Sequence, residues 1–156
     1  MKNCTNAEVS SLLKLTEINV ARVSGYESAI SKTGESELKK HLVDEFREMS
    51  ALTNQLNLVI NDFPEKTDYE KINDNNEKIS CTNFYFTVAK VSGNPRTVIL
   101  SCYLGDKSAL AAYRSFLKSE TTNLSPCLRE ILSKQLTNVE ESFLTTSQIL
   151  FEMTFA

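Results

Sequence analysis

The sequence of 156 residues predicts an all-α protein, an up-down four-helix bundle made of two helical hairpins joined by a long crossover. Apolar residues recur at intervals of three and four along four long segments, which is the spacing of helices with one buried face. Two of the connections between these segments are only a few residues long, and short connections join antiparallel neighbours. The chain contains only 4 Gly and 3 Pro, which favours helix over a turn-rich β fold.

The first predicted hairpin comprises helices over residues 6–33 and 36–62. Asn6 or Thr5 can cap the first helix, because a side-chain oxygen at the N-cap accepts a hydrogen bond from a free backbone N–H. Gly34 suits the left-handed conformation with which many helices end. Pro64 disfavours helical structure at the residue before it, so the second helix is expected to end close to residue 62.

The crossover over residues 64–95 contains a segment, residues 84–88, that is rich in β-forming side chains. Propensity alone predicts a strand there. A single strand would have no partner in an otherwise helical chain, however. We therefore predict a short helix over residues 79–91, with its aromatic side chains packed on the bundle.

The second predicted hairpin comprises helices over residues 96–120 and 126–155. The segment Ser92-Gly93-Asn94-Pro95 breaks the chain before the first of these. Ser125 and Pro126 are typical residues for the N-cap and the first turn, and they mark the start of the second. The apolar stripes predict a common core in which these residues are nearly fully buried: Leu42, Leu52, Leu110 and Val139.

Composition and charge argue against several classes of function. The net charge is −3 and basic residues are scattered, unlike the basic surface of a nucleic-acid-binding protein. No apolar stretch approaches the roughly 18–20 residues of a membrane-spanning helix, and the N-terminus lacks the apolar run of a secretory signal. None of the 4 cysteines forms a C-x-x-C pair and there is 1 histidine, which argues against a zinc site. We expect a cytoplasmic protein with neither nucleic-acid nor membrane partners.

Polar residues interrupt the inward apolar stripes of the four long helices at two neighbouring levels. Glu45, Asp106 and Gln135 fall directly on the apolar lines of their helices. They belong to a predicted polar layer that comprises Asn19, Arg22, Glu45, Asp106, Gln135 and Asn138. Burial of an unpaired carboxylate is costly, so each acid in this layer needs a partner or a proton.

Three interpretations of the polar layer remain open. Its residues are solvated at the margins of the stripes, or Arg22 neutralises Glu45 or Asp106 in a buried network, or the acids bind a divalent metal ion. The candidate metal ligands are Glu27, Glu45, Glu48 and Asp106. The step Glu45-x-x-Glu48 is similar to the Glu-x-x-His step of di-iron bundles, but the histidine is missing.

Several short motifs, taken in their order along the chain, resemble a bacterial family of ferritin-like four-helix-bundle proteins of unknown function. The resemblance extends from about residue 12 to residue 150 and rests on Gly25-Tyr26-Glu27-Ser28-Ala29, Phe46-Arg47-Glu48, Phe84-Tyr85-Phe86, Gly105-Asp106, Ala112-Tyr113 and Lys134-Gln135-Leu136. It implies a ferritin-like bundle and no established activity. Where that family tends to have acidic residues before the Gly-Tyr step and a histidine in the fourth helix, this chain has Ala21, Arg22, Ser24 and Phe143.

These features lead us to expect a non-enzymatic cytosolic bundle that acts through protein–protein contact or has a stress-related structural role. The alternative is a ferritin-like divalent-metal-binding protein or oxidase with a degenerate carboxylate site, using iron or manganese. His41 has no evident Ser or Cys nucleophile beside it, so no catalytic residue is assigned.

Residues 149–156 are apolar on more than one side and need cover. We expect Phe151 and Phe155 to contact either the aromatic crossover or a second subunit, with a dimer favoured. The expected partners are a second copy of the chain and an unidentified protein.

Overall fold

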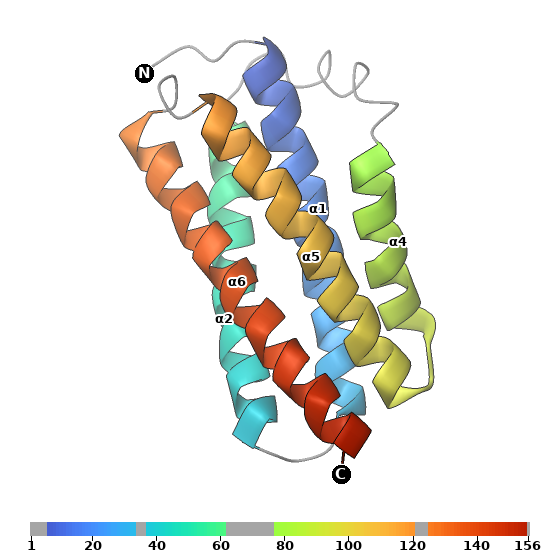
Figure 1. Cartoon of the computed structure of the whole chain (residues 1–156). Coiled ribbons are helices and arrows are strands. Elements are labelled where there is room, and N and C mark those ends of the chain that lie inside the picture. Colours follow the sequence, from blue (N-terminus) through green and yellow to red (C-terminus); the bar gives the residue numbers. More distant parts are fainter. Residues whose placement is uncertain (1–5, 34–36, 62–76, 121–124, 156) are drawn as a thin grey trace.

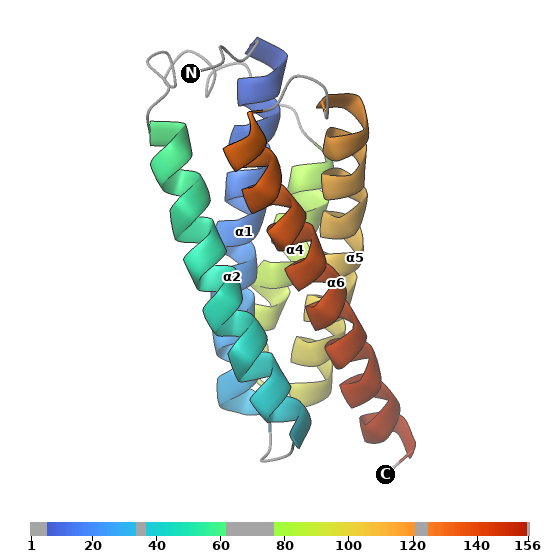
Figure 2. The same cartoon turned by 90° about the vertical axis from the view of Figure 1, so that its left-hand side faces the viewer.

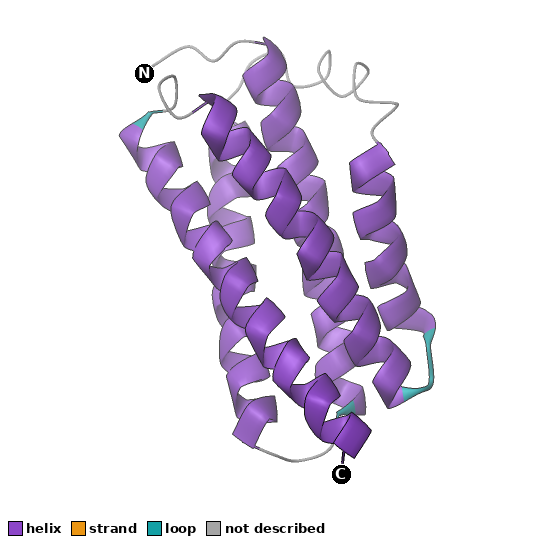
Figure 3. Ribbon diagram, in the orientation of Figure 1, coloured by secondary structure: helices purple, strands orange, loops and turns teal. Residues whose placement is uncertain are grey.

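The computed structural model describes residues 6–33, 37–61, 77–120 and 125–155, and these ranges contain helices and no strand (Figures 1 and 3). The helices are α1 (Asn6–Lys32), α2 (Glu37–Asn61), α4 (Glu77–Val91), α5 (Pro95–Glu120) and α6 (Pro126–Phe155). The all-α class predicted from the sequence is confirmed. Within the described ranges, no helix combines the length and the hydropathy that a membrane span requires.

The four long helices stand side by side, and α4 lies on the outside of the group (Figures 1 and 2). Contacts between the long helices run in a ring, from α1 to α2, from α2 to α6, from α6 to α5 and from α5 back to α1. Neighbours in this ring are antiparallel (Figure 1). α4 packs against α1 and α5, so it covers the groove between these two helices.

A helix, α4, forms in the crossover, where the sequence predicts a short helix over residues 79–91. Thr82, Phe86 and Ala89 of α4 are 0%, 1% and 0% exposed, and their spacing is that of one helical face. Burial of this face against α1 and α5 outweighs the β propensity of the segment. Residues 62–76, which include the predicted end of the second helix, lie outside the described residues.

The core of the bundle consists of two apolar clusters that follow one another along its axis. The first joins the N-terminal half of α1 to the C-terminal parts of α2 and α5 and the N-terminal half of α6. The second joins the opposite ends of these helices and includes Phe86 and Ala89 of α4. The four predicted core residues Leu42, Leu52, Leu110 and Val139 are 0%, 5%, 6% and 0% exposed, which confirms their assignment to inward faces.

Phe86 fills the groove between α1 and α5 at a level where both helices carry glycine. A Cβ atom placed on Gly25 would lie 2.6 Å from Phe86 Cδ1, and one placed on Gly105 would lie 2.6 Å from Phe86 Cε2 and Cζ. Non-bonded carbon atoms do not approach one another this closely, so a larger residue at either position would displace the ring. The two glycines therefore set how closely α4 approaches the bundle. On its inner side, the Phe86 ring lies 6.2 Å from the Tyr26 ring.

Gly105→Ala should lower the free energy of unfolding, although alanine has the higher helix propensity by about 1 kcal/mol. The new methyl group overlaps the Phe86 ring, and overpacking of this kind costs about 1–3 kcal/mol. In a Phe86→Ala background the overlap is gone, so the same substitution should become stabilising. Urea denaturation of the four proteins in this cycle measures the reversal of sign.

Gly93→Ala is the matched control for this cycle, because no atom lies within 4 Å of the Cβ that it adds. Its effect should be the same with and without the Phe86 ring. A Gly105→Ala variant as stable as the wild type, or more stable, would contradict the close approach.

Candidate functional site

The predicted polar layer is buried between the two apolar clusters and draws on all four long helices. The exposed fractions of its members are 1%, 1%, 8%, 0%, 1% and 0% for Asn19, Arg22, Glu45, Asp106, Gln135 and Asn138. The interpretation that these residues are solvated at the stripe margins is therefore wrong. The compensation that buried charge and amide groups require has to come from other groups inside the protein.

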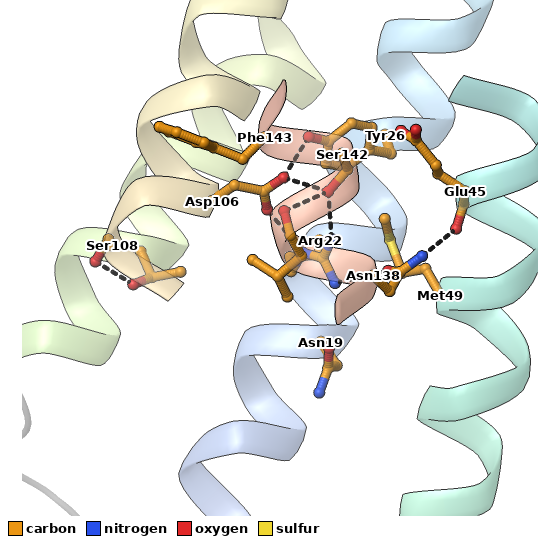
Figure 4. A network of polar contacts seen from close by, with 12 residues as sticks. Asn19, Arg22, Tyr26, Glu45, Met49, Asp106, Ser108, Asn138, Ser142 and Phe143 are labelled. Carbon is orange, nitrogen blue, oxygen red and sulfur yellow. Dashed lines mark hydrogen bonds and ion pairs between the residues drawn. The ribbon is translucent and has the colours of Figure 1, made fainter. Parts of the chain in front are cut away.

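The centre of the layer is an ion pair between α1 and α5. Arg22 Nε lies 2.7 Å from Asp106 Oδ1, and both side chains are almost fully buried. The other carboxylate oxygen, Asp106 Oδ2, accepts hydrogen bonds from the Tyr26 hydroxyl at 2.5 Å and from Ser142 Oγ at 2.6 Å. Figure 4 shows how these groups converge on the carboxylate of Asp106. Both of its oxygens therefore have partners inside the protein.

The guanidinium group of Arg22 also reaches α6. Its Nη2 donates to Ser142 Oγ at 2.8 Å and its Nη1 to Asn138 Oδ1 at 3.3 Å. Asn138 Nδ2 in turn donates to the backbone oxygen of Glu45 at 3.0 Å, which extends the network to α2. The charge of Arg22 is thus shared with Asp106 and two neutral side chains, while Glu45 takes part through its backbone.

Burial and the charge of Asp106 set the protonation states around the ion pair. Burial raises the pKa of Tyr26 well above its ordinary value and Asp106 raises it further, so the hydroxyl remains a donor. Burial lowers the pKa of Arg22, but Asp106, Tyr26 and Tyr113 together outweigh this effect, and the pKa lies above its ordinary value. Burial, followed by Asp106, raises the pKa of the Cys102 thiol well above its ordinary value. None of these groups is poised to exchange protons near neutral pH, as an acid or base catalyst would be.

A second set of hydrogen bonds lies about one turn away along α1. The Tyr113 hydroxyl donates to Gln135 Oε1 at 2.6 Å, and Gln135 Nε2 donates to the backbone oxygen of Leu52 at 3.0 Å. Asn19 Nδ2 donates to the backbone oxygen of Leu15 at 2.9 Å and to the Tyr113 hydroxyl. Burial raises the pKa of Tyr113, which keeps its proton on the oxygen. These bonds connect α1, α2, α5 and α6 independently of the ion pair.

The side-chain carboxylate of Glu45 takes part in neither set of bonds. Its Oε2 accepts a hydrogen bond from Thr145 Oγ1 at 2.6 Å, whereas its Oε1 is buried and has no hydrogen-bond partner among the described residues. Burial raises the pKa of Glu45 to about 7, and the negative charges of Glu141 and Asp106 act in the same direction. The sequence leaves open which acid Arg22 neutralises, and the structure shows that the direct partner is Asp106.

The four candidate metal ligands are not brought together. Glu27 and Glu48 are exposed, whereas Glu45 and Asp106 are buried. Both oxygens of Asp106 are engaged by protein donors. Among the residues that the structure describes, no group of three or more His, Cys, Asp or Glu side chains could hold a metal ion. The arrangement offers hydrogen bonding and charge compensation rather than an open coordination site.

The sequence did not assign Tyr26, Tyr113, Ser142 or Thr145 to the polar layer. Ser142 lies on the same apolar line of α6 as Gln135, and that position was the available signal. Helical spacing places a tyrosine ring on the inner face, but it does not determine whether the hydroxyl at the end of the ring is buried or reaches the surface. The sequence therefore does not reveal that both hydroxyls lie inside the bundle.

Comparisons of this chain with protein-family models, with curated proteins and with solved structures find no match. The resemblance to ferritin-like bundles therefore stays a prediction.

Arg22→Leu should lower the free energy of unfolding by about 3–5 kcal/mol, because it strands the buried carboxylate of Asp106 without its counter-charge. The double variant Arg22→Leu/Asp106→Leu should lose less stability than the two single variants together, since the two side chains interact directly. Urea denaturation measures both. The control is Arg114→Leu, which breaks the exposed 3.1 Å pair with Glu140 and should cost about 1 kcal/mol or less. Equal losses for the buried and exposed arginines would contradict the ion pair.

Glu45 should make the protein less stable above neutral pH than at mildly acidic pH. Its pKa of about 7 in the folded protein lies above the ordinary value of 4.5. The folded state thus binds this proton more tightly than the unfolded state, so the contribution to stability is full below pH 4.5 and is lost as the pH rises through 7. Relative to a Glu45→Gln variant, the wild type should therefore lose stability between pH 5 and pH 8.

The measurement is urea denaturation of both proteins across that pH range, with Glu130→Gln as a control at a site that is 69% exposed. A stability difference between wild type and Glu45→Gln that does not change with pH would show that Glu45 has no raised pKa.

Proposed function

We propose that this chain is a non-enzymatic helical-bundle protein that acts through contact with another protein, in the first instance a second copy of itself. The observation that carries the proposal is that the ion-pair network at the centre of the polar layer is fully engaged by groups of the protein. Arg22 and both oxygens of Asp106 are engaged by neighbouring side chains. An active site needs charged or nucleophilic groups that can reach a substrate. In the most polar part of this core, the charged groups are instead bonded to one another and to neighbouring side chains.

The outer face of α4 supports contact with another protein. Phe84 and Val91 are 63% and 74% exposed, and residues seven apart lie on one face of a helix. The opposite face of the same helix buries Phe86 and Ala89. A helix that is apolar on opposite faces needs cover on both of them. The bundle covers one face, and a partner would cover the other.

The ring of four antiparallel helices supports a ferritin-like arrangement as the finer description of the fold. In that proposal α1 with α2 and α5 with α6 are the two hairpins, and α4 is a helix within the crossover between them. The cytosolic location and the stress-related role stay predictions. Phe151 is 65% exposed, so it also offers surface for a partner, and the side chain of Phe155 lies outside the described residues.

Sedimentation analysis tests the association. The wild type should show twice the chain mass of 17.5 kDa, and a Phe84→Ser/Val91→Ser variant should shift to the single-chain mass with its helical circular dichroism intact. Leu58→Ser is the matched control, because Leu58 is 69% exposed on α2, away from α4. A wild type that remains a single chain at every concentration would contradict self-association, and a dimer that survives the double substitution would contradict the role of α4.

Metal analysis distinguishes the proposal from the alternative of a ferritin-like metal-binding protein. Protein purified without chelator should hold far less than one iron or manganese per chain. Addition of either ion should leave the melting temperature unchanged, because a ligand of the folded state raises it by mass action. One metal per chain that is lost in a Glu48→Gln variant would instead establish the ferritin-like metal-binding alternative.

A further inference from the structure

A groove of about 470 Å³ runs between α1 and α4 on the surface of the bundle. Part of its lining is apolar, and Val20 of α1 is 54% exposed there. The lining also contains one acidic and one basic side chain, Glu17 of α1 and Lys90 of α4. Many occupants could cover an apolar groove, so the positions of these two charges have to decide which occupant fits.

The two charges lie toward opposite ends of the groove. α1 and α4 run in the same direction (Figure 1), and Gly25 of α1 lies against Phe86 of α4. Glu17 precedes Gly25 by eight positions, and Lys90 follows Phe86 by four. At about 1.5 Å per residue, the acid lies about 12 Å before the Gly25–Phe86 contact and the lysine about 6 Å beyond it. The midpoint between the charges is therefore about 3 Å before the contact, which is the level of Phe84.

Neither charge is neutralised by a described part of the chain. Both side chains are exposed, and neither forms an ion pair or a hydrogen bond with another residue that the structure describes. Unneutralised charges beside an apolar surface restrict the choice of partner, because a like charge placed opposite either of them is unfavourable. Along its length the groove thus presents an acidic end, a middle level at which Phe84 is 63% exposed, and a basic end.

This pattern is complementary to itself. Contacts between identical subunits about a two-fold axis use the same surface on both subunits, so residue i faces residue j and j faces i. Inversion of the groove about its midpoint exchanges the acidic and the basic end. A second copy of the chain in the antiparallel direction therefore meets each charge with the opposite one. A parallel copy would leave these charges about 18 Å apart.

We propose that the α1–α4 groove is the interface of a two-fold dimer in which the α1–α4 layers of two copies pack face to face and antiparallel. The axis lies at the level of Phe84, so the Phe84 rings of both copies meet at the centre. Glu17 of each copy pairs with Lys90 of the partner subunit. The dimer rests on the self-association proposed above and adds to it the surface, the direction and the charge pairs that select the partner.

Charge reversal tests the pairing. A contact along a single groove is at the small end of specific interfaces, so wild-type association should be of micromolar affinity. Lys90→Glu and Glu17→Lys each place like charges opposite one another at both ends of their own dimers. Each variant should therefore weaken self-association at least about tenfold in sedimentation analysis over about 1–500 μM.

An equimolar mixture of Lys90→Glu and Glu17→Lys should associate as tightly as the wild type. In a mixed dimer one charge pair is native and the other is reversed, so both pairs have opposite signs. No contact within a single chain can produce this recovery. Lys40→Glu and Glu48→Lys are matched controls, because they make the same changes in charge at exposed positions of α2, across the bundle from α4 (Figure 1). The controls should leave the dissociation constant unchanged, alone or mixed.

Oxidative cross-linking provides a second readout and tests the position of the axis. The thiols introduced by Phe84→Cys lie together only if the axis is at this level, so peptide mapping of the oxidised dimer should find a disulfide bond between the two copies of position 84. Leu58→Cys, at a site on α2 that is 69% exposed, should give no such bond. Circular dichroism verifies that each variant is folded.

The outcomes separate the dimer geometry from the association itself. A wild-type dimer whose affinity is unchanged in both charge variants, or a mixture no tighter than its components, would overturn the pairing and leave the proposed self-association standing. A dimer in which position 84 does not cross-link would overturn the antiparallel register. A wild type that remains a single chain over the whole concentration range would overturn both the geometry and the self-association.

Discussion

The rest of the structure depends on the buried ion pair between Arg22 and Asp106. Removing two charges from water costs several kcal/mol per ion, and their attraction offsets this only if the remaining donors and acceptors are satisfied. Tyr26, Ser142 and Asn138 meet that requirement, so they must lie at the level of the pair. Through them the pair aligns α1, α5 and α6, and the bond from Asn138 to the backbone of α2 aligns the fourth helix.

This alignment contributes more to uniqueness than to stability. Apolar helix faces pack almost equally well after a shift of one turn, whereas a shift here would leave Arg22 or Asp106 buried without its partner. We infer that the polar layer selects one register among several that the apolar stripes alone would allow. Glu45 is the exception, because register does not require its unsatisfied oxygen.

The sequence predicts the helical class and the bounds of the long helices closely, because apolar spacing and capping residues are local signals. It also identifies the six residues of the polar layer, of which Glu45, Asp106 and Gln135 lie directly on apolar lines, but it leaves open whether they are buried or solvated. It does not predict that Asp106 rather than Glu45 pairs with Arg22. The relative heights of residues on different helices depend on how the helices cross, and no local sequence pattern encodes these crossing angles. The contact of Phe86 with Gly25 and Gly105 is hidden for the same reason. Those glycines lie in separate helices, and their role in making room for the Phe86 ring is evident only when α4 is in place against α1 and α5.

The close contacts of Phe86 with Gly25 and Gly105 couple three distant positions of the chain, because their side chains compete for one volume. A side chain gained at one position has to be matched by atoms lost at another, so single-step substitution is restricted and paired replacement is favoured. Tyr26 and Asp106 directly follow the two glycines in the chain, which extends the restriction to the partners of the ion pair. The crossover helix, whose composition is the least typical of a helix, should therefore diverge more slowly than its place on the outside of the bundle would indicate.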